Sequence, residues 1–250
     1  RRLSYRSTRR SRLDADRRPV VDYVGLGMIG KKEAAAELLR RREARRQLAA
    51  YINFTSPKYK QSGFSASVCA ALDMFLDDMQ AGKRPILILQ APPQHGKSEI
   101  VSRKLPAYIL GCFPDWRVGA ASYSDELANA MAQDVRRNLA DDRHRKLFPQ
   151  PAEKRRYDVN RTGEFTAPGG AGGYLGVGVG AGLTGRPVDI GIIDDPVKNS
   201  AEADSQTYRN TAWEWYTTTF KTRFEPNAIE VICQTRWHED DLTGRILKQI

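Results

Sequence analysis

The sequence lacks any apolar stretch long enough to cross a membrane. Its apolar segments, such as 85–89 and 188–193, are far shorter than the roughly 20 residues that a spanning helix needs. The Arg-rich first residues are not followed by the apolar core of a secretory signal. We therefore expect neither a membrane protein nor a secreted disulfide scaffold.

Cysteine is scarce. Cys69, Cys112 and Cys233 are the only three in 250 residues, and no two of them form a C-x-x-C pair. This excludes a disulfide scaffold and predicts reduced thiols in apolar surroundings. Hydrophobic residues make up 40% of the chain, enough for a sizeable core, and the length corresponds to one or two domains.

Positive charge is concentrated at one end. Residues 1–50 hold 15 Lys and Arg against 6 Asp and Glu, whereas residues 51–250 hold 25 against 24. We interpret 1–50 as a basic arm with a helix at 31–50, and 51–250 as the globular domain. Two interpretations of the arm stay open: it contacts nucleic acid or an acidic partner, or it is a solvated tail.

Short apolar segments alternate with helical ones along the globular domain. Strands are predicted at 85–90, 116–122, 188–193 and 229–233, and helices at 65–80, 97–110, 125–139 and 240–250. The Gly-rich segment 163–185 is either a hairpin or a loop, and its pattern does not decide. The alternation predicts an α/β fold with a mostly parallel central sheet flanked by helices, whose strand ends meet at one edge.

A phosphate-binding loop follows the first strand. Ala91-Pro-Pro-Gln-His-Gly-Lys-Ser98 matches the end of the pattern G-x-x-x-x-G-K-[ST] between a strand and a helix. Gly96 lets the backbone approach phosphates, Lys97 supplies a positive charge, and the Ser98 hydroxyl is a Mg²⁺ ligand. Ala91 departs from the pattern, and because the prolines donate no N–H, the cradle has to begin at Gln94.

A second strand ends in paired carboxylates. Segment 188–193 leads into Asp194 and Asp195, which suits Asp194 as the carboxylate that holds Mg²⁺ through water and Asp195 as the one that orients and activates the attacking water. An Asp-Asp-Pro turn after a buried strand is the alternative. The strand–helix unit 116–139 lies between the two motifs, which favours the P-loop NTPases with an extra strand between their Walker A and Walker B strands, the ASCE or RecA-like group.

A third strand ends in Gln234 and Thr235, which are candidates to sense the γ-phosphate. His238 and the following acids do not form an H-E-x-x-H zinc motif, so helix capping by Asp240 or Asp241 is preferred. Arg186, in the loop before the acidic strand, is a candidate arginine finger for a neighbouring subunit; a solvated loop arginine is the alternative.

These motifs together resemble the large terminase subunit of tailed bacteriophages, over about 54–247. The likeness rests on the stretches Pro-Pro-Gln-His-Gly-Lys-Ser-Glu at 92–99, Ala-Ala-Ser-Tyr-Ser at 120–124, Leu-Thr-Gly-Arg at 183–186, Ile-Asp-Asp-Pro at 193–196 and Thr-Arg-Trp-His at 235–238. The resemblance implies an ATPase, dependent on ATP and Mg²⁺, that translocates double-stranded DNA into a procapsid in the cytoplasm of an infected bacterium. It also implies a homo-oligomeric, pentameric ring, with a portal protein and a small terminase subunit as partners.

The resemblance assigns roles residue by residue. The nucleotide-binding set is Tyr59, Pro93, Gln94, His95, Gly96, Lys97, Ser98 and Glu99, with Phe64 as a second candidate for the adenine contact. The catalytic set is Lys97, Arg186, Asp195 and Thr235, and the metal ligands are Ser98 and Asp194. The metal-dependent nuclease domain of the family is expected outside these residues, because the chain ends shortly after the Thr-Arg-Trp-His motif.

Two alternative functions stay open. Another P-loop motor, such as a helicase, shares the motifs, although no second RecA-like domain is evident. A non-hydrolysing, nucleotide-dependent assembly module would suit Ala91, the two prolines and an Asp where many such ATPases have Glu.

Overall fold

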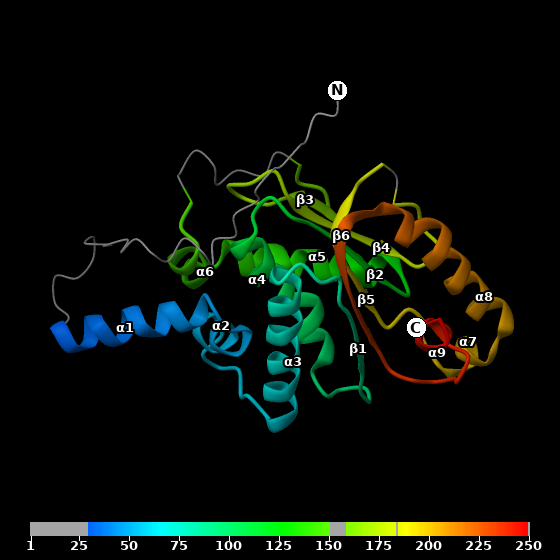
Figure 1. Ribbon diagram of the computed structural model, residues 1–250, viewed down its shortest axis with the longest axis horizontal. Helices are drawn as coiled ribbons and strands as arrows, with labels where there is room; N and C mark the ends of the chain where they lie inside the picture. The colour runs from blue at the N-terminus through cyan, green and yellow to red at the C-terminus, as the bar shows by residue number, and fades with distance from the viewer. Residues whose placement is uncertain (1–29, 151–158, 184, 250) are drawn as a thin grey trace.

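Residues 30–150, 159–183 and 185–249 are described by the computed structural model of the chain (Figure 1). The basic arm up to residue 29 lies outside the described residues. In the part described, six strands form one sheet in the order β1-β6-β5-β2-β4-β3. They are β1 (Ile86–Gln90), β2 (Arg117–Ser122), β3 (Glu164–Thr166), β4 (Gly173–Gly178), β5 (Val188–Asp194) and β6 (Phe224–Gln234).

The sheet is parallel except at one edge, where β3 runs antiparallel to β4. All seven residues of β5 are buried, as expected for a central strand covered on both faces. The predicted α/β fold with a mostly parallel sheet is thus confirmed. The open question about 163–185 is also settled, because β3 and β4 form a hairpin within that segment.

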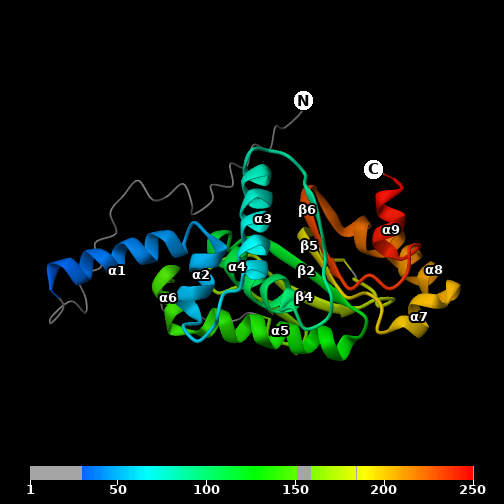
Figure 2. The same ribbon diagram turned by 90° about the horizontal axis from the view of Figure 1, so that it is seen from below.

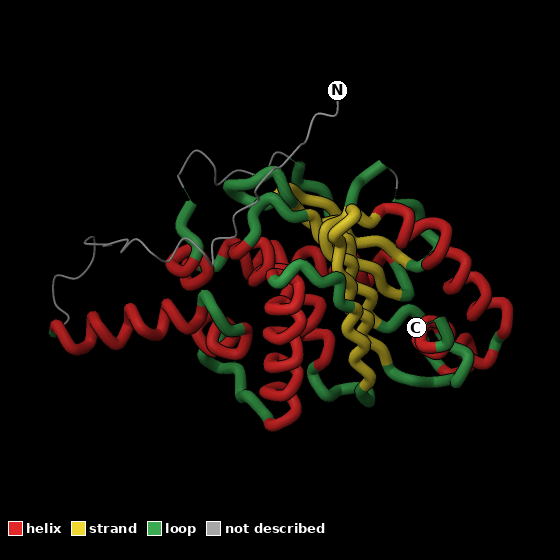
Figure 3. The backbone as a smooth tube through the Cα atoms, in the orientation of Figure 1, coloured by secondary structure: helices red, strands yellow, loops and turns green. Residues whose placement is uncertain are grey.

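Helices cover both faces of the sheet (Figure 2, Figure 3). One face carries α2 (Leu48–Thr55), α3 (Gly63–Gln80), the π-helix η2 (Glu99–Lys104), α4 (Leu105–Cys112), α5 (Asp125–Ala140) and α6 (Asp142–Leu147). The other carries α8 (Gln206–Trp215), the π-helix η4 (Tyr216–Phe220) and α9 (Leu242–Leu247), preceded by α7 (Ser200–Asp204) and with the 3₁₀ turn η5 (Lys221–Arg223) leading into β6.

Alternation along the strands divides the apolar residues into two cores. Ile190 and Ile192 of β5 belong to the core under α3, α4 and α5, whereas Ile193 belongs to the core under α8 and α9. Neighbouring side chains of a strand point to opposite faces, so a central strand with apolar residues in both registers joins both layers.

The N-terminal helix is shorter than the sequence suggests. The prediction of one helix over 31–50 is wrong: α1 (Lys31–Ala44) ends before a turn, and α2 begins at Leu48. The Leu48 N–H donates to Asp73 Oδ1 of α3 (2.9 Å), and the apolar side of α2 is buried with the main core. Tertiary packing thus imposes a break where no helix-breaking residue stands.

Helix α1 projects from the body, and Ala44 is its only buried residue (Figure 1). The proposed division of the chain after residue 50 stays a prediction, and α2 crosses it. Helices α6, α7 and α8 were not predicted. No helix among the described residues is both long and apolar enough to span a membrane.

The carboxylate that caps α2 gives the fold a pH dependence. Burial raises the pKa of Asp73 to about 6, while the hydrogen bond from the Leu48 N–H lowers it and the nearby Asp77 raises it further. The unfolded chain releases this proton near pH 4. Between these values the folded state binds more protons, so a rise in pH destabilises it.

We predict that the free energy of unfolding of the parent falls by about 2 kcal/mol from pH 4 to pH 6.5, relative to Asp73→Asn. The variant retains an acceptor for Leu48 but does not titrate. Urea unfolding at a series of pH values measures the difference. Asp78→Asn, at a half-exposed residue paired with Lys83, is the control and should run parallel to the parent. Parallel curves for the parent and Asp73→Asn would contradict the prediction.

Candidate nucleotide-binding site

The phosphate-binding loop connects β1 to the helical segment that leads into η2. Two of its residues have left-handed backbone conformations, Gln94 with φ of 62° and Gly96 with φ of 78°. Both are exposed, as is His95 between them. Such turns direct consecutive N–H groups into a concave anion site, which here lies at the N-terminus of a helix.

Lys97 joins three segments that are distant in the sequence. Its side chain is almost fully buried, and its Nζ donates to Asp195 Oδ2 (2.6 Å) and to Thr235 Oγ1 (3.1 Å). The strand register explains this meeting. Gln90 pairs with Gln234, and Cys233 pairs with Asp194, so β1, β6 and β5 end level with one another.

Asp195 is held by both neighbouring strands. Its N–H donates to the Cys233 carbonyl (2.8 Å), and its own carbonyl accepts from the Tyr123 N–H (3.1 Å). Its Oδ1 accepts from the Thr235 N–H (2.6 Å). These bonds maintain a φ of 45°, a conformation that is uncommon for residues other than glycine and that frequently occurs at functional sites.

Asp194 is 1% exposed, and each of its oxygens accepts from a serine hydroxyl. Ser98 donates to Oδ1 (3.1 Å) and Ser102 donates to Oδ2 (2.6 Å). Burial raises the pKa of the Asp194 carboxyl, as does the nearby Asp195, while the bonds from the two serines and the charge of Lys97 lower it. Carboxylate and hydroxyl oxygens 3.1 Å apart beside a phosphate loop are the hard donors that Mg²⁺ takes, so these residues fit that ion.

The sequence analysis did not identify Ser102 as a residue of the site. The signal available was its position four residues after Ser98, which places both on one face of the same helix. Its contact with Asp194 could not be foreseen because it lies within the π-helix η2, and hydrogen bonding of that kind has no recognised sequence pattern.

The third strand end is connected to the C-terminal helix. Gln234 is buried, and its Nε2 donates to Asp241 Oδ2 (2.8 Å). Asp241 also caps α9, because its Oδ1 accepts from the Gly244 N–H (2.8 Å). Of the two candidate caps, Asp241 is therefore the cap, whereas Asp240 pairs with Arg245 (2.7 Å).

Arg186 lies away from these groups. It lies in the loop before β5, whereas Asp194 is the last residue of that strand. The two residues therefore lie at opposite ends of β5. Its guanidinium pairs with Glu164 Oε1 of β3 (2.5 Å) and is half exposed. The fold therefore does not bring Arg186 to the Lys97 of its own chain. Thr184, in the same motif, lies outside the described residues.

The aromatic candidates differ in position. The Phe64 ring, at the start of α3, stands 5.9 Å from the His95 ring in an edge-on arrangement. Tyr59 is half-buried against the main core. The structure thus places Phe64 beside the phosphate loop, through its ring contact with His95, whereas Tyr59 packs against the main core. Glu99 forms ion pairs with Arg103 (3.9 Å) and Lys104 (3.8 Å) along η2.

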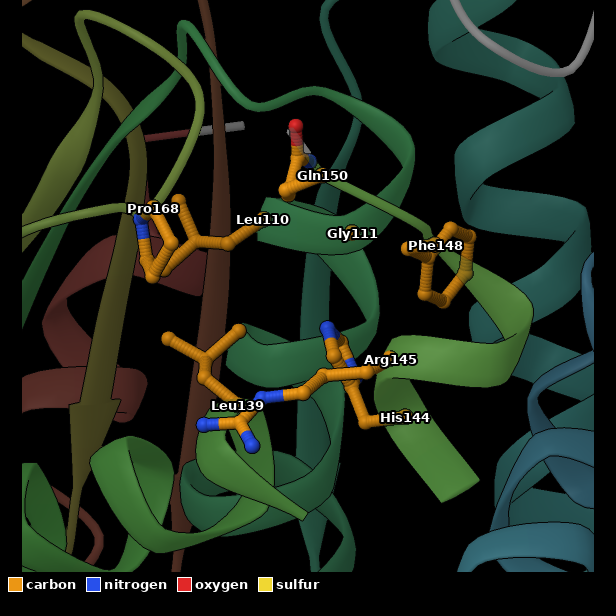
Figure 4. A pocket seen from close by; sticks show the side chains of 8 residues that line it. All are labelled: Leu110, Gly111, Leu139, His144, Arg145, Phe148, Gln150 and Pro168. Carbon is orange, nitrogen blue, oxygen red and sulfur yellow. The ribbon is translucent and has the colours of Figure 1, made fainter. Parts of the chain in front are cut away.

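A small cavity of about 30 Å³ lies among α4, α5 and α6, away from the phosphate loop (Figure 4). His144 and Arg145 line it together with apolar side chains such as Leu110 and Phe148. It has room for about two water molecules and not for a nucleotide.

Comparison with solved structures shows which fold the chain shares. The large terminase of bacteriophage HK97 is 15% identical, with a TM-score of 0.55 over 82% of this chain and 40% of that one, and this likeness shows the shared fold. The large terminase ATPase domain of Thermus phage P74-26 is 17% identical over 72% of this chain and 67% of that one, with a TM-score of 0.40. No curated protein matches the chain.

The family model described as "Terminase large subunit, T4likevirus-type, N-terminal" matches residues 88–246, which is more than half of the chain. The match includes Lys97, Asp194, Asp195 and Thr235, the residues that meet at the sheet edge. The chain therefore belongs to the family of the T4-like-virus-type terminase large subunit, in its N-terminal part.

Proposed function

We propose that this chain is the ATPase motor domain of a DNA-packaging terminase, which hydrolyses ATP to drive double-stranded DNA into a procapsid. The observation that carries the proposal is the convergence of the Lys97 ammonium with two carboxylates, Asp194 and Asp195, beside a phosphate loop. This set of groups is typical of phosphoryl transfer by P-loop NTPases.

The Lys97 ammonium forms a short ion pair with the Asp195 carboxylate (2.6 Å). Binding of a triphosphate at the N–H groups of 94–98 would attract the ammonium toward the β- and γ-phosphates. Asp195 would then lose its ionic partner and gain the freedom to orient water and accept its proton. The Thr235 N–H, bound to the other carboxylate oxygen, keeps Asp195 in place during this exchange.

Ser98 and Asp194 are the residues that would hold Mg²⁺. The ion would neutralise charge that develops on the phosphate oxygens. Asp194 is directed toward the loop by the two serines, so the protein supplies an oriented carboxylate rather than a mobile one.

Gln234 and Thr235 are proposed to connect the nucleotide to the rest of the molecule. Thr235 contacts both Lys97 and Asp195, and Gln234 contacts the cap of α9. A change at the γ-phosphate would therefore act on the position of α9 through two adjacent residues.

The whole protein's activity and partners are part of the proposal, because the chain spans 40% of the HK97 large terminase. We propose that the copies form a pentameric ring, that a portal protein and a small terminase subunit are partners, and that the protein acts in the host cytoplasm. Endonuclease activity is proposed only for the full-length protein. The family match disfavours a helicase; the non-hydrolysing assembly module is tested below.

We predict that Asp195→Asn abolishes hydrolysis and preserves nucleotide binding. Loss of the general base should lower the turnover of ATP by about 10²–10⁴-fold. Binding should be as tight as in the parent or tighter, because Lys97 no longer has to leave a carboxylate. Asparagine also tolerates a positive φ, so the turn should persist. Phosphate release and titration with a fluorescent ATP analogue measure the two effects.

Asp204→Asn, at an exposed residue of α7, is the control and should behave like the parent. Turnover of Asp195→Asn within a few-fold of the parent would remove Asp195 from the chemistry. A parent that binds ATP and releases no phosphate, alone or with procapsids and DNA, would instead favour the assembly module.

We predict that Arg186 acts on the nucleotide of a neighbouring copy. Arg186→Ala should lower turnover about 10³-fold or more, and mixing it with Asp195→Asn should restore activity, with a maximum near equal amounts. In the mixture an intact site of one variant lies beside the intact Arg186 of the other. Arg161→Ala is the matched control, because Arg161 is exposed and also pairs with Glu164. No recovery at any ratio would exclude action in trans.

A further inference from the structure

The helical segment after the phosphate loop contains a π-helix. In η2 the Leu105 N–H donates to the Ile100 carbonyl, five residues earlier. Such segments are rare and frequently lie at functional sites. Here η2 carries Ser102, which is 1% exposed and faces the end of β5.

Ser98 and Ser102 each donate to a different oxygen of the Asp194 carboxylate. The Ser102 hydroxyl donates to Asp194 Oδ2 at 2.6 Å, the shorter of the two bonds, and Ser98 donates to Oδ1 at 3.1 Å. A hydroxyl has a single proton to donate, so Ser102 commits its proton to Asp194. Each carboxylate oxygen, almost fully buried, thus has one donor.

The two serines are not equivalent once a nucleotide is bound. Ser98 immediately follows Lys97 and is the residue whose oxygen would turn to the metal. Asp194 Oδ1 then faces the metal, while Oδ2 retains Ser102 as its donor. A buried carboxylate without that donor would be poorly compensated and free to rotate.

We propose that Ser102 is a positioning residue for the magnesium site: it holds Asp194 in the orientation that receives the Mg²⁺ of a bound nucleotide. The inference rests on the proposed function, and it adds a residue that touches neither nucleotide nor metal.

The chain offers a matched control in Ser122. It is fully buried at the end of β2 and pairs in register with Asp194, yet its hydroxyl has no hydrogen-bond partner among the described residues. Ser122→Ala therefore removes the same atom from the same neighbourhood without removing a bond to the carboxylate.

The experiment compares ADP binding with Mg²⁺ and with EDTA by calorimetry, for the parent, Ser102→Ala, Ser102→Cys and Ser122→Ala. We expect Ser102→Ala to weaken Mg·ADP binding about 10-fold, the lower end for a residue that supports a metal ligand. Its affinity for metal-free ADP should not change. Ser102→Cys retains the shape of the side chain with a weaker donor, so its affinity for Mg·ADP should fall less than that of Ser102→Ala. This second variant keeps the test valid if the alanine variant does not fold. Ser122→Ala should match the parent.

Three results would overturn the proposal: an unchanged effect of Mg²⁺ in both Ser102 variants, an equal loss in Ser122→Ala, or an equal loss of metal-free binding. In each of these the parent still binds Mg·ADP more tightly than ADP, so the proposed function stands. A parent with no gain from Mg²⁺ would instead contradict the metal site of the proposed function, and the role of Ser102 with it.

Discussion

The bond between Lys97 and Asp195 is the interaction on which the candidate site depends. It joins residues 98 positions apart at 2.6 Å, and it forms only because β1, β6 and β5 run parallel and end level. A shift of one residue between two of these strands would turn the carboxylate to the other face of the sheet. The two apolar cores that fix this register therefore also fix the site.

The meeting of these groups and the cap of the last helix could be predicted from the sequence, whereas the contacts of Ser102 and of α2 could not. Asp195 and Thr235 each follow an apolar strand directly, Lys97 follows the phosphate loop after a third strand, and parallel strands place such ends together. Ser102 lies within a helix, where only its spacing from Ser98 sets it apart, and the π-helix depends on packing. The break before Leu48 likewise depends on Asp73, a residue of a different helix.

The position of Arg186 in the fold could not be predicted from its position in the sequence either. The sequence suggested a role for Arg186 at the nucleotide of a neighbouring subunit, which stays a prediction; within its own chain, the full length of β5 separates its loop from Asp194. Glu164, which binds it, comes from a hairpin whose existence the Gly-rich pattern left undecided. Distance along the chain therefore does not indicate distance in space when a central strand intervenes.

Asp195 joins neighbouring strand ends through its backbone and binds Lys97 through its side chain. Its backbone bonds join the ends of β2 and β6, and its side chain binds Lys97 through one oxygen and the Thr235 N–H through the other. On the proposed mechanism, release of the ammonium would change the charge near Asp195, whereas the backbone bonds and the bond from the Thr235 N–H do not involve Lys97. Lys97 would therefore exchange an internal carboxylate for a phosphate of the nucleotide while the backbone bonds around Asp195 stay in place. Gln234, the last residue of β6, donates to Asp241, the cap of α9, so the strand end beside Asp195 is also joined to the C-terminal helix.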